Sequence, residues 1–155
     1  FTLTTVIHTL IGEIAFGTSA GYAEIRATLR SYRNDDMKTL TQKAEEIATG
    51  IAKEQDLKID ISYTEEFLAL VNDRKANRII EKAAKDNGFK ISRLEKPFRW
   101  SEDFSYFTNS YQGALFGLGS GKKQPQLHNP DFDFPDELIE KGIAMFYSIY
   151  QNIVK

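Results

Sequence analysis

The sequence predicts a mixed fold of the α+β or α/β class, in which a ββαβ unit precedes a helix–strand–strand–helix unit. Three patterns predict it: alternation of apolar and polar residues, apolar residues spaced three and four apart, and a short run that is apolar throughout. They are typical of a half-buried strand, an amphipathic helix and a strand buried on both faces. All three occur within the 155 residues, so helices and strands are expected to share each core.

The first unit is predicted from residue type and alternation. Thr, Val, Ile and Leu dominate its first strand, and its second strand alternates apolar with polar residues. Asn34-Asp35-Asp36 is expected to supply the N-cap and the acidic first turn of the helix. The predicted elements are strands over residues 2–16 and 22–32, a hairpin loop over 17–21, a helix over 35–53 and a strand over 57–63.

The second unit begins after a boundary expected within residues 65–71. Gly88 is expected to end its first helix, and Asp103 to cap a short helix. The predicted elements are helices over 72–87, 103–107 and 136–153, and strands over 89–94 and 114–118. Along the last helix, the residues expected to face the core are Leu138, Ile139, Ile143, Phe146, Ile149, Tyr150 and Ile153.

Composition excludes several classes of protein. The formal net charge is −2 and the basic residues are scattered, so no nucleic-acid partner is expected. No run approaches the roughly 20 apolar residues of a membrane span. The chain has no cysteine, which excludes disulfides and thiolate zinc sites. We therefore expect an ordinary globular protein without a membrane partner, and cytoplasmic by default.

Three motifs follow one another in the carboxyl half. Ser101-Glu102-Asp103-Phe104-Ser105 is an acidic-aromatic turn, and Gly119-Ser120-Gly121 follows the second predicted strand. Leu127-His128-Asn129-Pro130-Asp131-Phe132-Asp133-Phe134 then leads into the last helix. This order resembles the carboxyl-terminal part of the aminoacylase/carboxypeptidase family of metal-dependent amidohydrolases, and most closely the hippurate hydrolase and auxin-conjugate hydrolase branch.

The amino half is similar to the same family. Gly12-Glu13-Ile14-Ala15-Phe16 and Ala23–Ser31 resemble two strands of its lid domain, and Asn72-Asp73 resembles its N-D pair. The resemblance implies that residues 1–66 are the remnant of a ferredoxin-like lid and dimerisation domain, and that residues 67–155 are the carboxyl part of a catalytic domain. Gly17 stands where the family has a lid asparagine.

The resemblance also implies a fragment. The family's H-x-C-G-H-D metal motif and its Glu-Glu pair are missing, and the chain begins at Phe1 without an initiator methionine. The intact parent is expected to cleave the amide bond of N-acyl amino acids or small peptides, whereas the fragment alone is expected to be inactive. The alternative is a non-catalytic dimerisation or binding module. The expected partners are a small N-acyl amino acid and a second copy bound through the lid.

Five residues are candidates for the site. By resemblance, His128 is a ligand of a divalent metal, zinc or manganese. Its residue type alone favours the alternative, a turn histidine hydrogen-bonded to a neighbouring carboxylate. If it is a ligand, Asp133 is expected to orient its second nitrogen. Arg30 is expected to hold a substrate carboxylate, since a guanidinium fork suits that group. Gly119 and Gly121 are expected to offer backbone N–H groups to the substrate, and Glu102 is a catalytic candidate or merely part of a turn.

Overall fold

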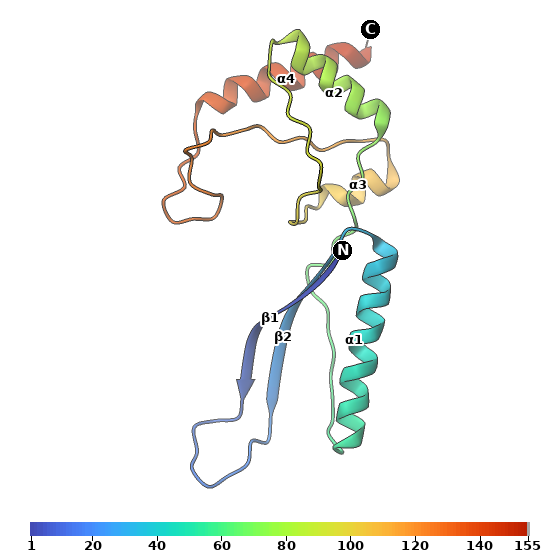
Figure 1. Cartoon of the computed structure of the whole chain (residues 1–155), viewed down its shortest axis with the longest axis vertical. Coiled ribbons are helices and arrows are strands. Elements are labelled where there is room, and N and C mark those ends of the chain that lie inside the picture. The colour runs from blue at the N-terminus through green and yellow to red at the C-terminus, as the bar shows by residue number, and fades with distance from the viewer. Residues whose placement is uncertain (155) are drawn as a thin grey trace. The chain divides into compact units, whose positions relative to one another are not determined.

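The computed structural model describes residues 1–154 and confirms the mixed α+β class. A two-stranded antiparallel sheet and four helices are assigned among these residues (Figure 1). They belong to two compact units, one built from Phe1–Ala69 with Pro97–Ser101, the other from Leu70–Lys96 with the residues from Glu102 onward. The boundary after Ala69 lies within residues 65–71. The inclusion of Pro97–Ser101 in the first unit has no counterpart in the sequence pattern.

The first unit contains a β-hairpin of β1 (Thr2–Ile11) and β2 (Ala23–Ser31). β1 ends five residues before the predicted residue 16, because the chain turns at Gly12. That residue has φ +55°, and a Cβ there would lie 2.9 Å from the Cβ of Ala20. The Gly12 N–H donates to the Tyr22 carbonyl at 2.9 Å. Only glycine fits this close turn, which closes the hairpin before residues 13–16 can pair.

Helix α1 (Asn34–Glu54) follows the hairpin and agrees closely with the predicted 35–53. Asp35 and Asp36 occupy its first turn, as expected. The predicted cap at Asn34 is wrong, since no side chain caps this helix. The Asn34 Oδ1 instead accepts the N–H of Ala69 at 2.7 Å. Because a contact distant in sequence occupies this oxygen, it does not serve the first turn of the helix.

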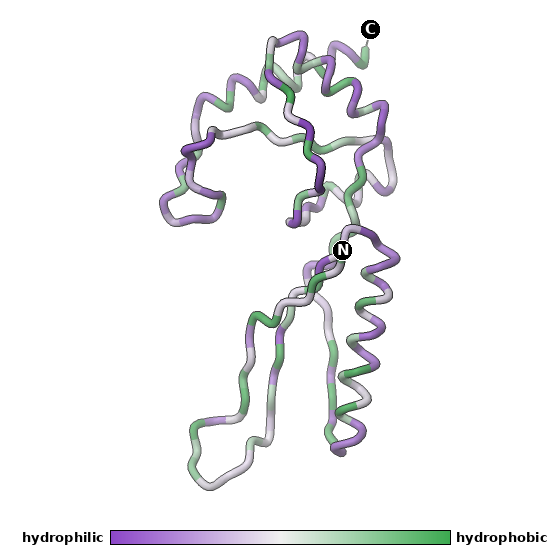
Figure 2. The backbone as a smooth tube through the Cα atoms, in the orientation of Figure 1, coloured by the Kyte–Doolittle hydropathy of each residue, from purple (hydrophilic) through white to green (hydrophobic). Residues whose placement is uncertain are grey.

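The strand predicted over residues 57–63 is not formed. The segment is extended and alternates hydrophobic with hydrophilic residues (Figure 2), and it lies along α1, where the Tyr63 hydroxyl donates to Glu45 Oε1 at 2.8 Å. Its alternate side chains, from Leu57 to Tyr63, remain 40–63% exposed. A strand requires a hydrogen-bonded neighbour, and among residues 1–154 the only ladder joins β1 to β2. The predicted ββαβ order is therefore ββα followed by an extended segment.

In the second unit, α2 (Arg74–Asp86) has well-defined ends. The Asp73 carboxylate accepts the N–H groups of Lys75 and Ala76 at 2.8 and 2.9 Å, so Asp73 is the N-cap. At the other end, Gly88 has φ +68° and its N–H donates to the Lys85 carbonyl at 2.9 Å, while the next N–H donates to Ala84 at 2.8 Å. This pair of bonds is a Schellman motif and confirms Gly88 as the residue that ends the helix.

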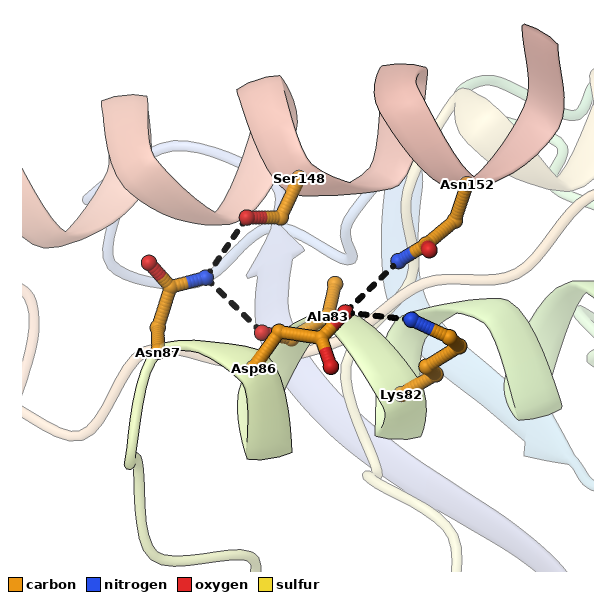
Figure 3. Close-up of polar contacts among 6 residues, drawn as sticks. All are labelled: Lys82, Ala83, Asp86, Asn87, Ser148 and Asn152. Carbon is orange, nitrogen blue, oxygen red and sulfur yellow. Dashed lines mark hydrogen bonds and ion pairs between the residues drawn. The ribbon is translucent and has the colours of Figure 1, made fainter. Parts of the chain in front are cut away.

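The core of the second unit lies between α2 and α4 (Glu137–Val154). Ala83, Ala84 and Met145 are buried there. Polar bonds flank this contact (Figure 3): Asn87 Nδ2 donates to Ser148 Oγ at 2.7 Å, and Asn152 Nδ2 donates to Asp86 Oδ2 at 3.2 Å. Small side chains on α2 let the two helices approach closely, and the polar bonds set how far one lies along the other.

The strands predicted over 89–94 and 114–118 are also not formed. Phe89, Ile91 and Phe116 pack against the α2–α4 core, but neither segment belongs to a ladder among residues 1–154. Arg93 holds the first segment to α2 through two bonds to Glu81, at 3.0 and 2.9 Å. Apolar runs predict burial, whereas strand pairing also needs a neighbour in register, and residues 1–154 provide none at this position.

Two further predictions are corrected. In α3 (Phe104–Ser110), Asp103 occupies the N-cap position but makes no capping bond, because its backbone is already helical. On α4, five of the seven residues predicted to face the core are 52–65% exposed; they are Ile139, Ile143, Phe146, Tyr150 and Ile153. The contact with α2 covers only one side of a stripe that is wider than one helix can bury.

The N-cap of α2 can be tested against the uncapped α3. Asp73→Ala removes two bonds to backbone N–H groups and is expected to lower the free energy of unfolding by about 1 kcal/mol. Asp103→Ala is the matched control and should cost less than about half of that, because Asp103 makes no capping bond. Urea unfolding followed by circular dichroism measures both, and equal losses would refute the assignment.

The Arg93–Glu81 pair predicts a pH dependence. The hydrogen bond from Arg93 holds the pKa of the Glu81 carboxyl below its ordinary value of 4.5. Because the folded pKa is depressed, the stabilisation is present above the unfolded pKa and is lost as the pH falls through the folded pKa. We expect Arg93→Ala to destabilise the chain at pH 7 but not well below pH 4.5, and to return the pKa of Glu81 to its ordinary range in an NMR titration.

Lys90→Ala is the control for this pair, because it removes a positive charge from the same segment without touching Glu81. Its effect on unfolding should not follow the titration of that carboxyl. If both variants show the same pH profile, net charge rather than the pair is responsible.

Candidate functional site

His128 lies in a compact surface turn between residues 124 and 133. Two backbone bonds shape the turn, from Asn129 N–H to the Gln126 carbonyl and from Phe132 N–H to the Asn129 carbonyl, both at 3.0 Å. The side-chain amide of Gln124 donates to the Asp133 carbonyl and closes its base. His128 itself has φ +73°, a left-handed conformation in which histidine is enriched among non-glycine residues. The turn therefore displays an exposed imidazole.

The donor set around His128 is incomplete. Within residues 1–154, no three His, Cys, Asp or Glu side chains are grouped so that they could hold a metal ion. The hydrogen bond expected from Asp133 to His128 is also not formed among these residues, and both side chains are exposed. A catalytic zinc site normally has three protein ligands. Residues 1–154 thus fit a catalytic metal site only as the source of one histidine.

The glycine loop follows the apolar segment 114–118 and precedes the histidine turn. Gly121 has φ +110°, and a Cβ added at Gly119 would meet no atom within 4 Å. Both residues are exposed, so their backbone is open to a ligand. At the start of the segment, the side chain of Asn72 bonds both backbone groups of Leu115. The sequence does not reveal this contact of Asn72, although Asn72-Asp73 resembles the family's N-D pair.

Arg30 lies on β2 in the first unit and is half-buried. Its Nη1 donates to the Arg99 carbonyl in the 97–101 segment, and Arg99 itself stacks over the ring of Phe1, 5.4 Å from the centroid. A guanidinium has five N–H donors, so one bond to a carbonyl orients the group without consuming it. The fork retains the donors that a carboxylate requires.

Arg26 provides the contrast. It shares a strand face with Arg30, because side chains four residues apart on a strand point the same way. Its guanidinium, however, is paired with the Glu24 carboxylate. The hydrogen bonds from Arg26 and then from Tyr22 lower the pKa of Glu24. Of these two arginines, Arg26 already has a carboxylate partner within the chain, whereas Arg30 is bonded only to a neutral carbonyl.

Glu102 precedes α3 and is exposed. Its backbone carbonyl accepts the N–H of Ser105 at 3.0 Å, which begins the helix. A hollow of about 460 Å³ opens elsewhere in the second unit, lined by residues 71–73 and 108–112. None of the five predicted site residues lines it. The structure thus places Glu102, Gly119, Gly121 and His128 on exposed loops of one unit, and Arg30 in the other.

The sequence matches the model of peptidase family M20/M25/M40 over residues 8–152. That match covers nearly the whole chain. The chain belongs to peptidase family M20/M25/M40. Its relatives in the family include the N-acetyldiaminopimelate deacetylases of Oenococcus oeni, 30% identical over 132 residues, and of Exiguobacterium sibiricum, 29% identical over 136 residues. The aligned regions cover 83% and 87% of this chain, but only 34% and 36% of those enzymes.

A solved structure shows the same fold. The dinuclear metal binding peptidase of the M20 family from Bacillus subtilis superposes with a TM-score of 0.73 at 16% sequence identity. The match covers 99% of this chain and 42% of that one. This M20/M25/M40 chain therefore spans little more than a third of the relatives it matches. Among residues 1–154, no helix is both long and apolar enough to cross a membrane.

Proposed function

We propose that this chain supplies the carboxyl-terminal part of a metal-dependent amidohydrolase that cleaves the amide bond of N-acyl amino acids or small peptides. The observation that carries the proposal is the exposed imidazole of His128 in its L-H-x-P turn, in a chain that belongs to peptidase family M20/M25/M40. The deacetylases among its relatives act on an N-acetyl amino acid. We place the chain in the hippurate hydrolase branch, whose substrates are also N-acyl amino acids, and we propose such compounds as its substrate class.

Each predicted residue has a role in this proposal. His128 ligates one ion of a zinc or manganese pair, which when bound polarises the scissile carbonyl and activates water. Arg30 holds the substrate carboxylate through its remaining donors. Gly119 and Gly121 present backbone N–H groups to the substrate, and the exposed carboxylate of Glu102 is a candidate for proton transfer.

On this proposal the other metal ligands come from outside residues 1–154, because these residues contain no group of three side chains that could hold a metal ion. The general base is a glutamate from outside the same residues. On this proposal, residues 1–155 alone have no measurable hydrolase activity. A single histidine also binds a divalent ion far more weakly than the three ligands of a catalytic site.

We further propose that the first unit joins two copies of the complete enzyme. All ten residues of β1 are exposed, and within residues 1–154 its only strand partner is β2. An open strand edge is a template for pairing with another chain. A chain that dimerises in this way but does not hydrolyse amides would be the binding module, which is the second candidate function.

His128 decides between the enzyme and the module. In a complete enzyme that contains these residues, His128→Ala should remove one equivalent of bound metal. It should also lower kcat by more than the roughly 10–100-fold loss seen when a residue that only orients a ligand is removed. Elemental analysis and steady-state kinetics with an N-acyl amino acid measure the two effects. Full metal content in the variant would exclude His128 as a ligand.

His8→Ala is the matched control, because the chain has only two histidines and His8 lies in β1. This variant should keep both its metal and its activity. A loss of metal from both variants would indicate a general disturbance of folding rather than removal of a ligand.

Arg30 is expected to contribute to substrate affinity. In the complete enzyme, Arg30→Ala should remove a charge-assisted bond worth about 1.5–3 kcal/mol, which corresponds to a roughly 10- to 150-fold rise in KM. The free energy of unfolding should fall by only the roughly 0.5–1.5 kcal/mol that one hydrogen bond contributes, because Arg30 also loses its bond to the Arg99 carbonyl. Arg26→Ala on the same strand face should leave KM unchanged, since Arg26 is paired with Glu24. Equal effects of the two variants on KM would contradict the assignment.

A further inference from the structure

The side chain of Asn72 is bonded to the backbone of a residue far along the sequence. Its Nδ2 donates to the Leu115 carbonyl at 2.8 Å, and the Leu115 N–H donates to its Oδ1 at 2.9 Å. A backbone N–H can only donate and a carbonyl only accept, so this pair of bonds fixes which way the carboxamide lies. Asn77 Oδ1 accepts a second bond from the same Nδ2 at 3.1 Å. The carboxamide is therefore held from both sides.

This pattern reproduces the pairing that a neighbouring strand would provide. In an antiparallel ladder, one residue exchanges both an N–H and a carbonyl with its partner. Here a side-chain amide makes the same two bonds to Leu115, in a segment that has no strand partner among residues 1–154. The adjacent Asp73 N–H adds a bond to the Gly113 carbonyl at 2.9 Å. Part-buried backbone groups that would otherwise lack partners are thereby satisfied.

The same segment has two further contacts downstream. The ring of Phe116 packs against the core and lies 5.6 Å from that of Phe146. A Cβ added at Gly142 of α4 would lie 3.5 Å from Leu118 Cδ1. The side chain of Leu118 therefore packs on α4 at Gly142, the position where the helix has no side chain. The segment is thus positioned at its start by Asn72 and along its length by α4, and it leads directly into Gly119-Ser120-Gly121.

We propose that Asn72 is a positioning residue for the glycine loop. Asn72 fixes the backbone of Leu115 beside the start of α2. It thereby sets the direction of residues 116–118, and hence the position of the N–H groups of Gly119 and Gly121. The inference rests on the proposed function in one respect, which is that these N–H groups meet a substrate carboxylate. Its structural part, the dependence of loop order on Asn72, stands apart from any ligand.

The test uses the whole 155-residue chain labelled with ¹⁵N. In Asn72→Ala, amide exchange at Leu115 should become about tenfold faster or more, because its N–H loses its acceptor. The heteronuclear NOE values of Gly119 and Gly121 should fall with it. Asn72→Asp keeps the acceptor but loses the donor, so Leu115 should stay partly protected and the glycine loop should be intermediate. Asn77→Ala is the control, because both bonds to Leu115 remain.

Addition of N-acetylglycine, with N-acetylglycine methylamide as the carboxylate-free comparison, separates the two parts of the proposal. In the native chain, the carboxylate compound alone should shift the Gly119 and Gly121 amide signals, and Asn72→Ala should abolish the shift. Unchanged NOE values of the glycine loop in Asn72→Ala would overturn the positioning role, as would an equal effect of Asn77→Ala. If the loop loses order but the native chain shows no shift, the positioning role is upheld and the carboxylate role of the glycine loop fails.

Discussion

The packing of two consecutive alanines, Ala83 and Ala84, against Met145 is the contact on which the second unit depends. Alanine has the highest helix propensity and the smallest side chain that does not loosen a helix. It therefore supports α2 and at the same time allows α4 to lie close to it. The polar bonds from Asn87 to Ser148 and from Asn152 to Asp86 then align the two helices along their length. The extended segments that carry the candidate site take their places against this pair.

Those extended segments show how backbone groups are satisfied without a sheet. Buried N–H and carbonyl groups need partners, and a ladder is the usual source. In the second unit, side chains provide some of these bonds. Asn72 bonds the backbone of Leu115 in this way, whereas Glu81 holds the 89–94 segment through the side chain of Arg93 and satisfies no backbone group. Side-chain bonds fix only a few points along a segment, which leaves the residues beyond them free to form loops such as the one at Gly119.

In the candidate site, too, a few hydrogen bonds hold the backbone, and the functional side chains lie beside them. Backbone bonds within residues 124–133 hold the turn, in which His128 has a positive φ and is exposed. On β2, Arg26 and Arg30 lie on the same face of the strand, but their hydrogen-bond partners differ. Glu24 neutralises the first, whereas a carbonyl orients the second. Arg26 is thus paired with a carboxylate of its own strand, whereas Arg30 is bonded to a backbone carbonyl.

The local signals in the sequence determined the elements that depend on local physics. The hairpin, α1, α2 and α4 follow from alternation, from three-and-four spacing and from the glycine at the end of α2, because the interactions that form them lie within a few residues. The motif around His128 likewise indicated a surface turn. Only the tertiary structure decided the rest. Asn34 accepts from Ala69 rather than capping its helix, and Arg30 meets Arg99.

The segments over 57–63 and 89–94 mix apolar with polar residues, and the segment over 114–118 is apolar throughout. None of the three pairs among residues 1–154, since a strand exists only when a neighbour in register supplies its hydrogen bonds. Asn72 could be noticed in the sequence, but its role could not be inferred, because it depends on a residue more than 40 positions away. The spacing of apolar residues indicates which secondary structure a segment prefers. Which partner it meets is set by the packing of the whole chain.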